Sequence, residues 1–392
     1  MLYKKKKFCG ICDSSNLVKL FDLKKFPITG IYIKKKLRKN FNYFFNQHLN
    51  ICKKCGHIQL GNFVNPEFLY NNFYSTRTSD NHLSKNGIEF FKNFLFDVTK
   101  KKTFRNFAEI GCNDIKLIKS LKSNFKHLYG IDPIWRSKKN IKDKKITVIG
   151  GFIEKINLKK TIKEQVEIFS STHNLEHLSD PYEALKKIVD YSDKDTLFFI
   201  EVPDVDLMIK NLRFDQIFHQ HYHYFNFNSL NNLINKLNCK IIKKRINPNF
   251  WGGSILIAFK KDSKLQRKKI FKNIFHLQNK KILENYSIFK KHYKKLRNNL
   301  IEEKSLVGYG AGQMVPSFAY HLKSNLAFLD YIVDDNKNRQ DQSYPNLKPK
   351  IRLSKDALIS KKKVLITALD GVKAISNKLK RKKIDFVNPL FR

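Results

Sequence analysis

The sequence predicts an α/β chain in three parts: a small N-terminal domain, a central α/β domain and a smaller C-terminal α/β domain. Three observations predict this class. The chain has 392 residues, which is more than one ordinary core takes. Hydrophobic residues make up 42% of it, enough to bury sizeable cores. Strand-like and helix-like segments alternate in the middle of the chain and again near its end, which is typical of parallel sheets covered by helices.

The N-terminal part, over 1–75, contains four of the six cysteines, in two C-x2-C pairs separated by 39 residues: Cys9, Cys12, Cys52 and Cys55. In a reduced compartment such pairs predict a structural zinc site, because each presents two thiolates to one ion. Disulfides are the alternative in a secreted chain, but no apolar stretch follows the basic start of this chain to form a signal peptide. His57 is an alternative ligand, and Cys112 and Cys239 are expected to be packed thiols.

The central part, over 76–260, contains an expected helix over 80–100 and then a series of strand-like segments. These segments are FRNFAEIG, HLYGIDP, ITVIGGF, EIFSSTH and TLFFIEVP. Helices are expected between them, over 115–125 and 181–190. The alternation predicts a mostly parallel sheet with helices on its faces.

The C-terminal part, over 261–392, begins with one long expected helix over 263–301. Its apolar residues recur at three-to-four spacing, and its other face is rich in lysine and is expected to be solvated. The rest, over 304–392, alternates again through KSLVGYG, LDYIVDD, KKVLITA and IDFVNPL. This pattern predicts a second, smaller α/β unit.

The net charge of +43 is the strongest argument for a nucleic-acid partner, because Lys and Arg neutralise phosphates. The lysines are nevertheless spread along the whole chain and form no single stripe. The chain is also rich in Lys, Asn, Ile and Phe and poor in Ala, Gly and Pro, as an AT-rich coding sequence imposes. We therefore interpret the charge as background. We expect no membrane span, since no run of about 18 apolar residues occurs, and a cytoplasmic location as the default. The sequence does not determine the oligomeric state, and a monomer is favoured.

A cofactor-binding turn is predicted where the first central strand ends in Glu109-Ile110-Gly111. Backbone amides at the start of the next helix face a ligand there. Twenty-three residues after Glu109, a second strand ends in Asp132, which is placed to accept hydrogen bonds from ribose hydroxyls. The turn lacks the G-x-G-x-x-G pattern of a pyrophosphate site, so S-adenosylmethionine (SAM), which has no phosphate, suits it. The candidate cofactor residues are Glu109, Gly111, Asp114, Asp132, Pro133 and Phe152.

A second glycine-rich turn, over 308–312, follows the first strand of the C-terminal α/β unit. Asp334 and Asp335 stand at the end of the next strand. These features satisfy much of the dinucleotide rule by themselves. An NAD-binding oxidoreductase is therefore a rival interpretation.

Several motifs, taken in their order along the chain, resemble one known family: the two C-x2-C pairs, NNFYSTRTS, EIGCND, GIDP, NLEHLSDP, FDQIFHQHYHYF, WGGS and VGYGAG. Over nearly its whole length the chain resembles the three-domain SAM-dependent C-methyltransferases of nucleotide-activated deoxysugars. The resemblance implies a zinc-binding N-terminal domain, a central class I methyltransferase domain and a C-terminal Rossmann-like domain that closes the sugar-nucleotide site without a second cofactor. It also implies a dTDP-linked 4-keto sugar as substrate, methylated at the neighbouring carbon.

The same resemblance implies catalytic roles. The second histidine of the family's Y-H-E-H-L-S-Y-F pattern, the proposed base, corresponds to His221. Histidine suits this role because its pKa lies near the working pH. His177 and Tyr74 are implied to line the pocket. Gln220 stands where the family has a glutamate, and it can orient a neighbour but cannot accept a proton.

Other positions depart from the family's pattern. Phe218 replaces a tyrosine, and His173 stands where asparagine is common. Ile115 replaces a glycine one residue into a helix, where it is tolerated if φ is negative, and we expect it to reshape the pocket wall without abolishing SAM binding. His219 and His223 alternate with His221, so all three are expected on one side of a strand, as an aromatic–histidine core or a second metal site.

The sequence therefore predicts a SAM-dependent methyltransferase that acts on a sugar nucleotide, at carbon. Sugar O-methylation is an alternative, because it needs only a base near a hydroxyl group. Nucleic-acid binding or modification, with the zinc knuckles as the reader, is an alternative of a different class. A non-catalytic relative is the expectation if Ile115 closes the cofactor turn.

Overall fold

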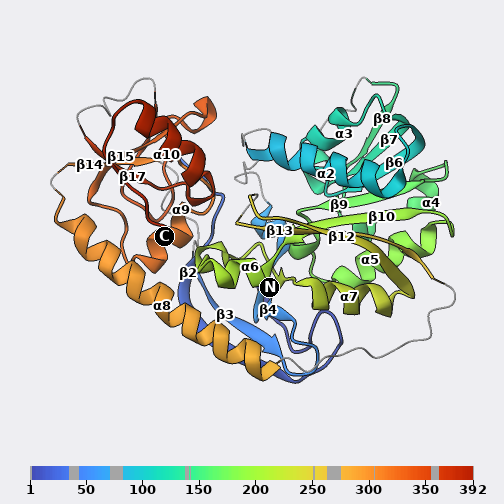
Figure 1. Cartoon of the computed structure of the whole chain (residues 1–392), viewed down its shortest axis with the longest axis horizontal. Helices are drawn as coiled ribbons and strands as arrows, with labels where there is room; N and C mark the ends of the chain where they lie inside the picture. The colour runs from blue at the N-terminus through green and yellow to red at the C-terminus, as the bar shows by residue number, and fades with distance from the viewer. Residues whose placement is uncertain are drawn as a thin grey trace.

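The computed structural model describes residues 2–34, 44–70, 83–136, 141, 143–249, 252–262, 275–303, 305–354 and 362–391. Figure 1 shows two α/β lobes, with the N-terminal strands below and between them and the long helix α8 (Phe275–Ile301) along the outer side. Tyr74 and the first part of the helix predicted over 263–301 lie outside these residues. No helix in the described ranges combines the length and the apolar character that crossing a bilayer requires.

The central lobe is built on a seven-stranded sheet. Its strands, in spatial order, are β12 (Cys239–Asn247), β13 (Ser254–Lys261), β10 (Leu197–Pro203), β9 (Ile168–Thr172), β6 (Phe104–Ile110), β7 (Phe125–Ile131) and β8 (Ile146–Ile149). The five strands from β10 to β8 are parallel, and β12 and β13 form an antiparallel pair at one edge. The chain order reverses between β6 and β9, which makes the carboxyl ends of these strands the expected ligand side.

Helices cover both faces of this sheet, so the last five residues of β6 are buried. The helices are α2 (Leu83–Thr99), α3 (Lys116–Ser120), α4 (Leu158–Thr161), α5 (Pro181–Tyr191), α6 (Val205–Lys210) and α7 (Phe227–Lys236). The short 3₁₀ helices are η3 (Pro133–Trp135), η4 (Ile153–Lys155), η5 (Leu175–His177) and η6 (Phe214–Gln216). Helix α3 is shorter than the predicted 115–125, because the chain turns back into β7 at Phe125.

The N-terminal part forms a four-stranded sheet in the order β11-β4-β3-β2. Its strands are β2 (Leu17–Pro27), β3 (Phe44–Cys52), β4 (Ile58–Leu60) and β11 (His223–Tyr224), while β1 (Tyr3–Lys5) pairs with β5 (Asn62–Val64) and α1 (Pro66–Leu69) follows. Strand β11 comes from the central part of the chain and pairs antiparallel with β4. The N-terminal sheet is therefore attached directly to the loop that carries His221. The boundaries near 75 and 260 stay predictions.

The C-terminal lobe contains the predicted second α/β unit. Its five parallel strands are β16 (Ile351–Leu353), β15 (Leu329–Asp334), β14 (Leu306–Tyr309), β17 (Lys363–Ile366) and β18 (Phe386–Val387), in spatial order. The helical segments are α9 (Val315–His321), α10 (Val372–Arg381), η7 (Lys337–Arg339) and η8 (Leu369–Gly371). Chain order reverses between β14 and β17, so the glycine turn after β14 lies at a second switch point.

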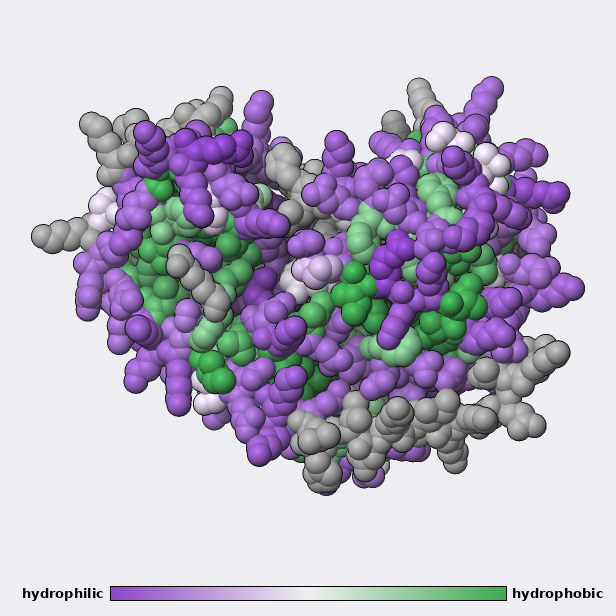
Figure 2. All heavy atoms as spheres, in the orientation of Figure 1, coloured by the Kyte–Doolittle hydropathy of each residue, from purple (hydrophilic) through white to green (hydrophobic). Residues whose placement is uncertain are grey.

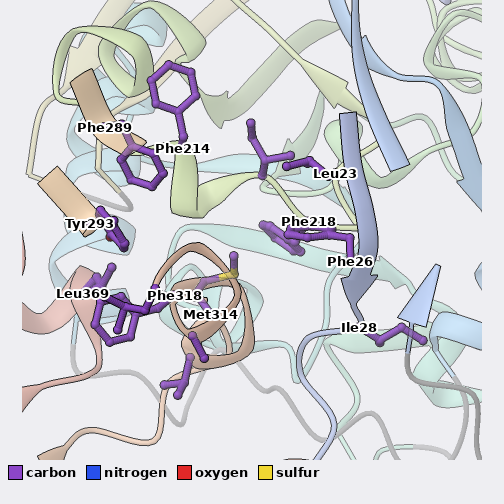
Figure 3. Close-up of a cluster of buried hydrophobic side chains, with 14 of the residues drawn as sticks. Leu23, Phe26, Ile28, Phe214, Phe218, Phe289, Tyr293, Met314, Phe318 and Leu369 are labelled. Atoms are coloured by element: carbon purple, nitrogen blue, oxygen red, sulfur yellow. The ribbon is translucent and has the colours of Figure 1, made fainter. Parts of the chain in front are cut away.

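One apolar core joins all three parts of the chain. Figure 3 shows Leu23 and Phe26 of β2 facing Phe214 and Phe218 of the central part, with side chains of α8 and the C-terminal lobe on the other side. Those further side chains are Phe289, Tyr293, Met314, Phe318 and Leu369. Because this packing is continuous, it sets the positions of the two lobes and thus of the loops between them.

A buried ion-pair network links the same lobes. The guanidinium of Arg213 donates from Nε and Nη2 to the two carboxylate oxygens of Asp215, at 2.9 Å each. Its Nη2 also donates to Oδ1 of Asp370 in the C-terminal lobe, at 2.7 Å. The Asp215 side chain is fully buried, so it depends on this single bidentate partner for charge neutralisation.

We expect Arg213→Ala to destabilise the protein by about 3–5 kcal/mol, because it leaves the Asp215 carboxylate buried without its cation. The measurement is the unfolding free energy from urea titration of the zinc-loaded chain. Lys186→Ala is the matched control, since it breaks the exposed Lys186–Asp190 pair and should change little. Equal effects of the two changes would contradict a role for the buried network.

Candidate active site

The four cysteines of the C-x2-C pairs converge in the N-terminal part. Cys9 Sγ lies 3.5 Å from Cys55 Sγ, and Cys12 Sγ lies 3.6 Å from Cys52 Sγ. All four sulfurs lie within 4.8 Å of one another, and none is in a disulfide. Four sulfurs at zinc–sulfur distance from one tetrahedral ion would be about 3.8 Å apart. The donor set therefore fits zinc and confirms the predicted structural site, closed by four thiolates.

His57 is not part of this cluster, so its prediction as an alternative ligand is wrong. Its Nε2 lies 3.0 Å from Nδ1 of His223, and both rings are buried. Strand β4 begins at the next residue, which turns the His57 ring toward β11 and away from the sulfurs. Cys112 and Cys239 are buried thiols outside the cluster, as predicted.

A cavity of about 490 Å³ lies between the central and the C-terminal lobe. Figure 2 shows the surface indented between these lobes. The central lobe contributes the carboxyl ends of β6, β9 and β10, and the C-terminal lobe contributes the loops after β14, β15 and β17. Sequence-predicted residues that line the cavity are Glu109, Gly111, His173, His177, Phe218, His221, His223, Gly310, Gly312, Asp334 and Asp335. The two switch points thus open on one shared space.

The loop after β6 has the geometry of a cofactor turn. Gly111 has φ of +78°, and a Cβ there would lie 2.3 Å from the side chain of Asn174, so only glycine fits. The N–H of Asn113 donates to Oδ2 of Asp132 at 2.8 Å, while Oδ1 of Asp132 accepts from the N–H of Ile134 at 2.9 Å. Asp132 therefore ties the loop to the end of β7.

Four of the predicted cofactor residues do not line the cavity. Asp114 belongs to the loop after β6, Asp132 follows β7, and Pro133 begins η3. The Phe152 ring lies 4.8 Å from the guanidinium carbon of Arg136, beside the loop after β8. Contact of these four residues with the cofactor stays a prediction.

Glu109 is the charged group at the base of the turn. Its Oε1 accepts a hydrogen bond from Thr172 Oγ1 at 2.9 Å, while Oε2 is buried and has no hydrogen-bond partner among the described residues. Burial raises the pKa of Glu109 to about 8, with a smaller contribution from Asp132. A buried carboxyl group without a second partner suits a cationic ligand, and SAM carries an ammonium group. The turn and its acid thus fit the predicted cofactor.

SAM binding near pH 7 is expected to release about one proton from Glu109, since a bound cation favours its ionised form. The measurement is calorimetric titration with SAM in buffers of different ionisation enthalpy. In Glu109→Gln the release should disappear, and SAM affinity should fall by roughly tenfold or more. Glu167→Gln, on an exposed carboxyl group of the same lobe, is the control. Proton release that persists in Glu109→Gln would contradict this assignment.

Ile115 differs from the expectation in two ways. Its φ is +59°, in the left-handed region, where a β-branched residue is strained. It does not line the cavity either, so the predicted reshaping of the pocket wall is wrong. Its side chain is buried in the core formed by α2, α3 and the sheet, next to residues such as Leu117 and Ile118. The tight loop held by Asp132 imposes the positive φ, and burial of the side chain offsets the strain.

We expect Ile115→Ala to destabilise the protein more than Ile115→Gly. Both lose the buried side chain, which costs about 2–5 kcal/mol, but only glycine relieves the left-handed strain of about 1–2 kcal/mol. Both variants should keep their SAM affinity, because the side chain is outside the cavity. Chemical unfolding midpoints and calorimetry measure the two effects. The usual order, with glycine worse than alanine, would contradict the left-handed conformation.

The histidines His177 and His221 meet at the cavity wall, with ring centroids 4.6 Å apart. His177 Nδ1 lies 2.8 Å from the backbone oxygen of Gln220. The Tyr70 hydroxyl oxygen lies 2.9 Å from the same nitrogen and can either donate or accept, but the carbonyl oxygen only accepts, so we assign the proton of neutral His177 to Nδ1. Burial holds the pKa of His221 well below its ordinary value, and the neighbouring histidines lower it further. His221 is therefore neutral at pH 7 and able to accept a proton.

Glu176, which sequence reasoning missed, lies among three histidines. Its Oε1 is 3.7 Å from His173 Nδ1, 3.9 Å from His177 Nε2 and 3.8 Å from His221 Nε2. Burial alone lowers the pKa of His173, but Glu176 and Glu201 outweigh it and raise this pKa to about 9. His173 is thus positively charged at neutral pH. The signal that could have identified Glu176 is its place beside His177 in NLEHLSDP.

The H-x-H-x-H segment does not present its histidines on one side, so that expectation is wrong. His219 Nε2 lies 3.0 Å from the backbone oxygen of Phe26, away from the cavity, whereas His221 and His223 both line the cavity and His223 also contacts His57. The reason is that residues 219–222 form a turn, and β11 spans only His223–Tyr224. The predicted strand periodicity therefore does not apply.

Gln220 is directed away from the cavity toward the N-terminal sheet. Its Oε1 accepts from Thr29 Oγ1 at 3.1 Å, and its Nε2 donates to the Thr29 backbone oxygen at 2.8 Å. It is 1% exposed and does not line the cavity. The side chain thus anchors the loop and does not reach a substrate in the cavity, in contrast to the predicted catalytic role.

Comparison with known families matches two parts of the chain. Residues 9–70 match the family described as "Putative zinc binding domain", and residues 83–244 match a methyltransferase domain family. Fold and matches together define the class of protein: the chain carries a class I methyltransferase domain, whose methyl donor is SAM, after a zinc-binding domain. The predicted enzyme class and both predicted cofactors are thereby confirmed.

A curated relative is the C-methyltransferase NovU of Streptomyces niveus, which is 21% identical over 260 residues. The match covers 64% of this chain and 59% of that protein. Among solved structures, N-methyltransferase NodS of Bradyrhizobium japonicum, in complex with S-adenosyl-L-homocysteine, aligns with 50% of this chain and 94% of its own, at 13% identity and a TM-score of 0.37. A SAM-dependent methyltransferase from Clostridium acetobutylicum aligns with 45% of this chain and 92% of its own, at 9% identity and a TM-score of 0.34.

Proposed function

We propose that this protein methylates a carbon next to the ketone of a nucleotide-linked keto-deoxysugar, with SAM as methyl donor. The observation that carries the proposal is a buried, neutral histidine, His221, in the same cavity as the cofactor turn at Gly111. The similarity to a C-methyltransferase supports transfer to carbon. A nucleotide-linked sugar suits a cavity that lies between two α/β lobes, each with its switch point toward it.

In the proposed reaction His221 accepts the proton from the carbon next to the ketone, and the electron pair of that C–H bond passes into an enolate. SAM, when bound, supplies an electrophilic methyl group that the enolate carbon attacks. The positive charge of His173, in the same cavity, favours the developing enolate oxygen. The surrounding residues exclude water, since His221 and Phe218 are largely buried and their rings are in contact, with centroids 4.0 Å apart.

The nucleotide part is assigned to the glycine turn of the C-terminal lobe. Gly310 has φ of +96°, and the N–H of Ala311 donates to Oδ2 of Asp334 at 2.6 Å. Asp334 thus holds the turn much as Asp132 holds the turn of the central lobe. Arg339 lines the cavity beside it, where its Nη1 donates to the Ala311 backbone oxygen at 2.7 Å and lies 3.5 Å from Asp334 Oδ2, and it adds a positive charge to the side of the cavity proposed for the diphosphate. We assign the nucleotide of the substrate to this turn, and not NAD, because the turn shares its cavity with the methyltransferase site.

The experiment incubates the zinc-loaded protein with SAM and a panel of dTDP-4-keto-deoxysugars. Mass spectrometry should show one added methyl group, and NMR should place it on the carbon next to the ketone. Without methyl transfer, the same protons should exchange with deuterium from solvent when S-adenosyl-L-homocysteine is bound. Methylation of oxygen would instead support a sugar O-methyltransferase. Absence of both exchange and transfer on every ketosugar would overturn the proposal.

A further inference from the structure

We propose that Glu176 is a positioning residue that orients the His221 imidazole and stabilises its protonated form during proton abstraction. This inference rests on the proposed function, in which His221 is the base. Glu176 belongs to η5, whereas His221 belongs to the loop before β11, 45 residues further on. Only the fold brings the two groups together.

The first argument is that the Glu176 side chain is buried and makes no hydrogen bond among the described residues. It is 1% exposed, and neither oxygen has a hydrogen-bond partner among the described residues. A buried carboxylate whose donors lie only at long range is costly, so such a group persists where one of these contacts shortens in a functional state. The nearest groups are the three histidine nitrogens at 3.7 to 3.9 Å from Oε1. Hydrogen bonds between catalytic groups are often this long before substrate binds.

The protonation of the three histidines selects His221 as the partner that matters for catalysis. Neutral His177 has its proton on Nδ1, toward the Gln220 carbonyl, so its Nε2 has no hydrogen to donate to Glu176. His173 is already protonated and faces two carboxylates, with Nδ1 3.7 Å from Glu176 Oε1 and Nε2 3.6 Å from Glu201 Oε1, so its charge does not change during proton abstraction. His221 is left with Nε2 toward Glu176, which favours the tautomer with the proton on Nε2.

This tautomer leaves Nδ1 of His221 as the proton acceptor. The substrate C–H proton passes to Nδ1, its electron pair stays in the enolate, and the imidazolium retains Nε2–H toward Glu176. The transferred proton stays on the imidazole, and the Glu176 carboxylate stabilises the imidazolium, as the acid does in a nucleophile–histidine–acid arrangement. Gln220, the sequence neighbour of His221, cannot take this role because its amide is bound to Thr29 and is uncharged.

The test is an NMR titration of His221 in the full-length, zinc-loaded chain, with Glu176→Gln as the variant. Other titratable groups near the ring are His177, His173 and Tyr224, and all are kept in this variant. Loss of the carboxylate should lower the His221 pKa by about one unit or more. The proton of neutral His221 should also no longer reside mainly on Nε2, as 15N shifts report. Glu176→Asp, which keeps a carboxylate, should restore most of the His221 pKa and most of the population with the proton on Nε2. Glu201→Gln, which removes the carboxylate on the other side of His173, should change the His221 pKa less than Glu176→Gln does.

Kinetics provide the second readout. Glu176→Gln should lower kcat roughly 10- to 100-fold with little change in KM for either substrate, because the base and not the binding surface is affected. The acidic limb of the kcat/KM profile should move to lower pH, since a base of lower pKa stays deprotonated further into acid. A His221 pKa that does not move in Glu176→Gln would overturn the inference. A shifted pKa without methyl transfer on any ketosugar would uphold the coupling and count against the proposed function alone.

The metal content of the protein tests whether Glu176, His177 and His221 instead bind a second metal ion. Glu176, His177 and His221 have ligand atoms within 4.8 Å of one another, which is compatible with one shared ion. An ion bound there would be coordinated by Nε2 of His221, the nitrogen that carries the proton in the proposed arrangement. Elemental analysis of the purified protein should give one zinc per chain, from the cysteine cluster. A second ion that is lost in His221→Ala would overturn the positioning role.

Discussion

His221→Ala is expected to lower methyl transfer by about 10²- to 10⁴-fold, the usual contribution of a general base. The affinity for SAM should stay nearly unchanged, because the cofactor turn at Gly111 belongs to a different loop of the cavity. The α-proton exchange of the ketosugar should be lost together with methyl transfer, since both need the same base. Turnover assays, calorimetry and deuterium exchange on one protein preparation measure all three quantities.

The control for His221→Ala is His127→Ala, which removes a half-buried imidazole on β7 that contacts Thr147 outside the cavity. It should leave turnover unchanged. Both variants should retain one zinc per chain and a wild-type unfolding midpoint, which separates loss of the base from loss of the fold. Full activity in His221→Ala would remove this residue as the base, and proton exchange without methyl transfer would assign the base to another group.

Cys52→Ser is expected to prevent folding of the N-terminal part. The four sulfurs are largely buried, and zinc binding to such sites contributes about 10–16 kcal/mol at pH 7, which is as large as the whole stability of a typical domain, about 5–15 kcal/mol. Zinc content and unfolding midpoint should both fall. Methyl transfer should be lost as well, because β4 pairs with β11 and thereby supports the loop that carries His221.

The matched control is Cys239→Ser, which changes a buried cysteine outside the cluster. It should retain one zinc per chain, with at most a moderate loss of stability. Chelation of the wild-type protein should reproduce the effect of Cys52→Ser, since the ion and not the individual thiol holds the segment together. A stable, zinc-free and active Cys52→Ser protein would contradict the structural role of the ion.

Local patterns allowed a large part of the architecture to be predicted. Both α/β units, strand β6 before Gly111 and helix α5 depend on residues close together in sequence, through alternation, turn chemistry and helical spacing. The cysteine pairs likewise indicated their own chemistry, because thiolates at this spacing have few other uses in a reduced compartment. The helix over 115–125 was overextended, since β7 begins at Phe125.

The candidate site was only partly predictable. Its pieces were visible, with Gly111, His177 and His221 all lining one cavity. Gln220 was expected at the reacting centre, but it bonds to Thr29, which is 191 residues away in sequence. No local pattern contains such a contact.

By itself the sequence determined which chemistry this protein carries: four thiolates for one ion, a glycine turn for a cofactor and histidines for proton transfer. Only the tertiary structure decided which of these groups meet. It placed Glu176 beside His221, directed Gln220 away and forced Ile115 into the left-handed region. The physical reason is that spacing and propensity act over a few residues, whereas packing among distant segments sets side-chain contacts and overrides the preference of a single residue.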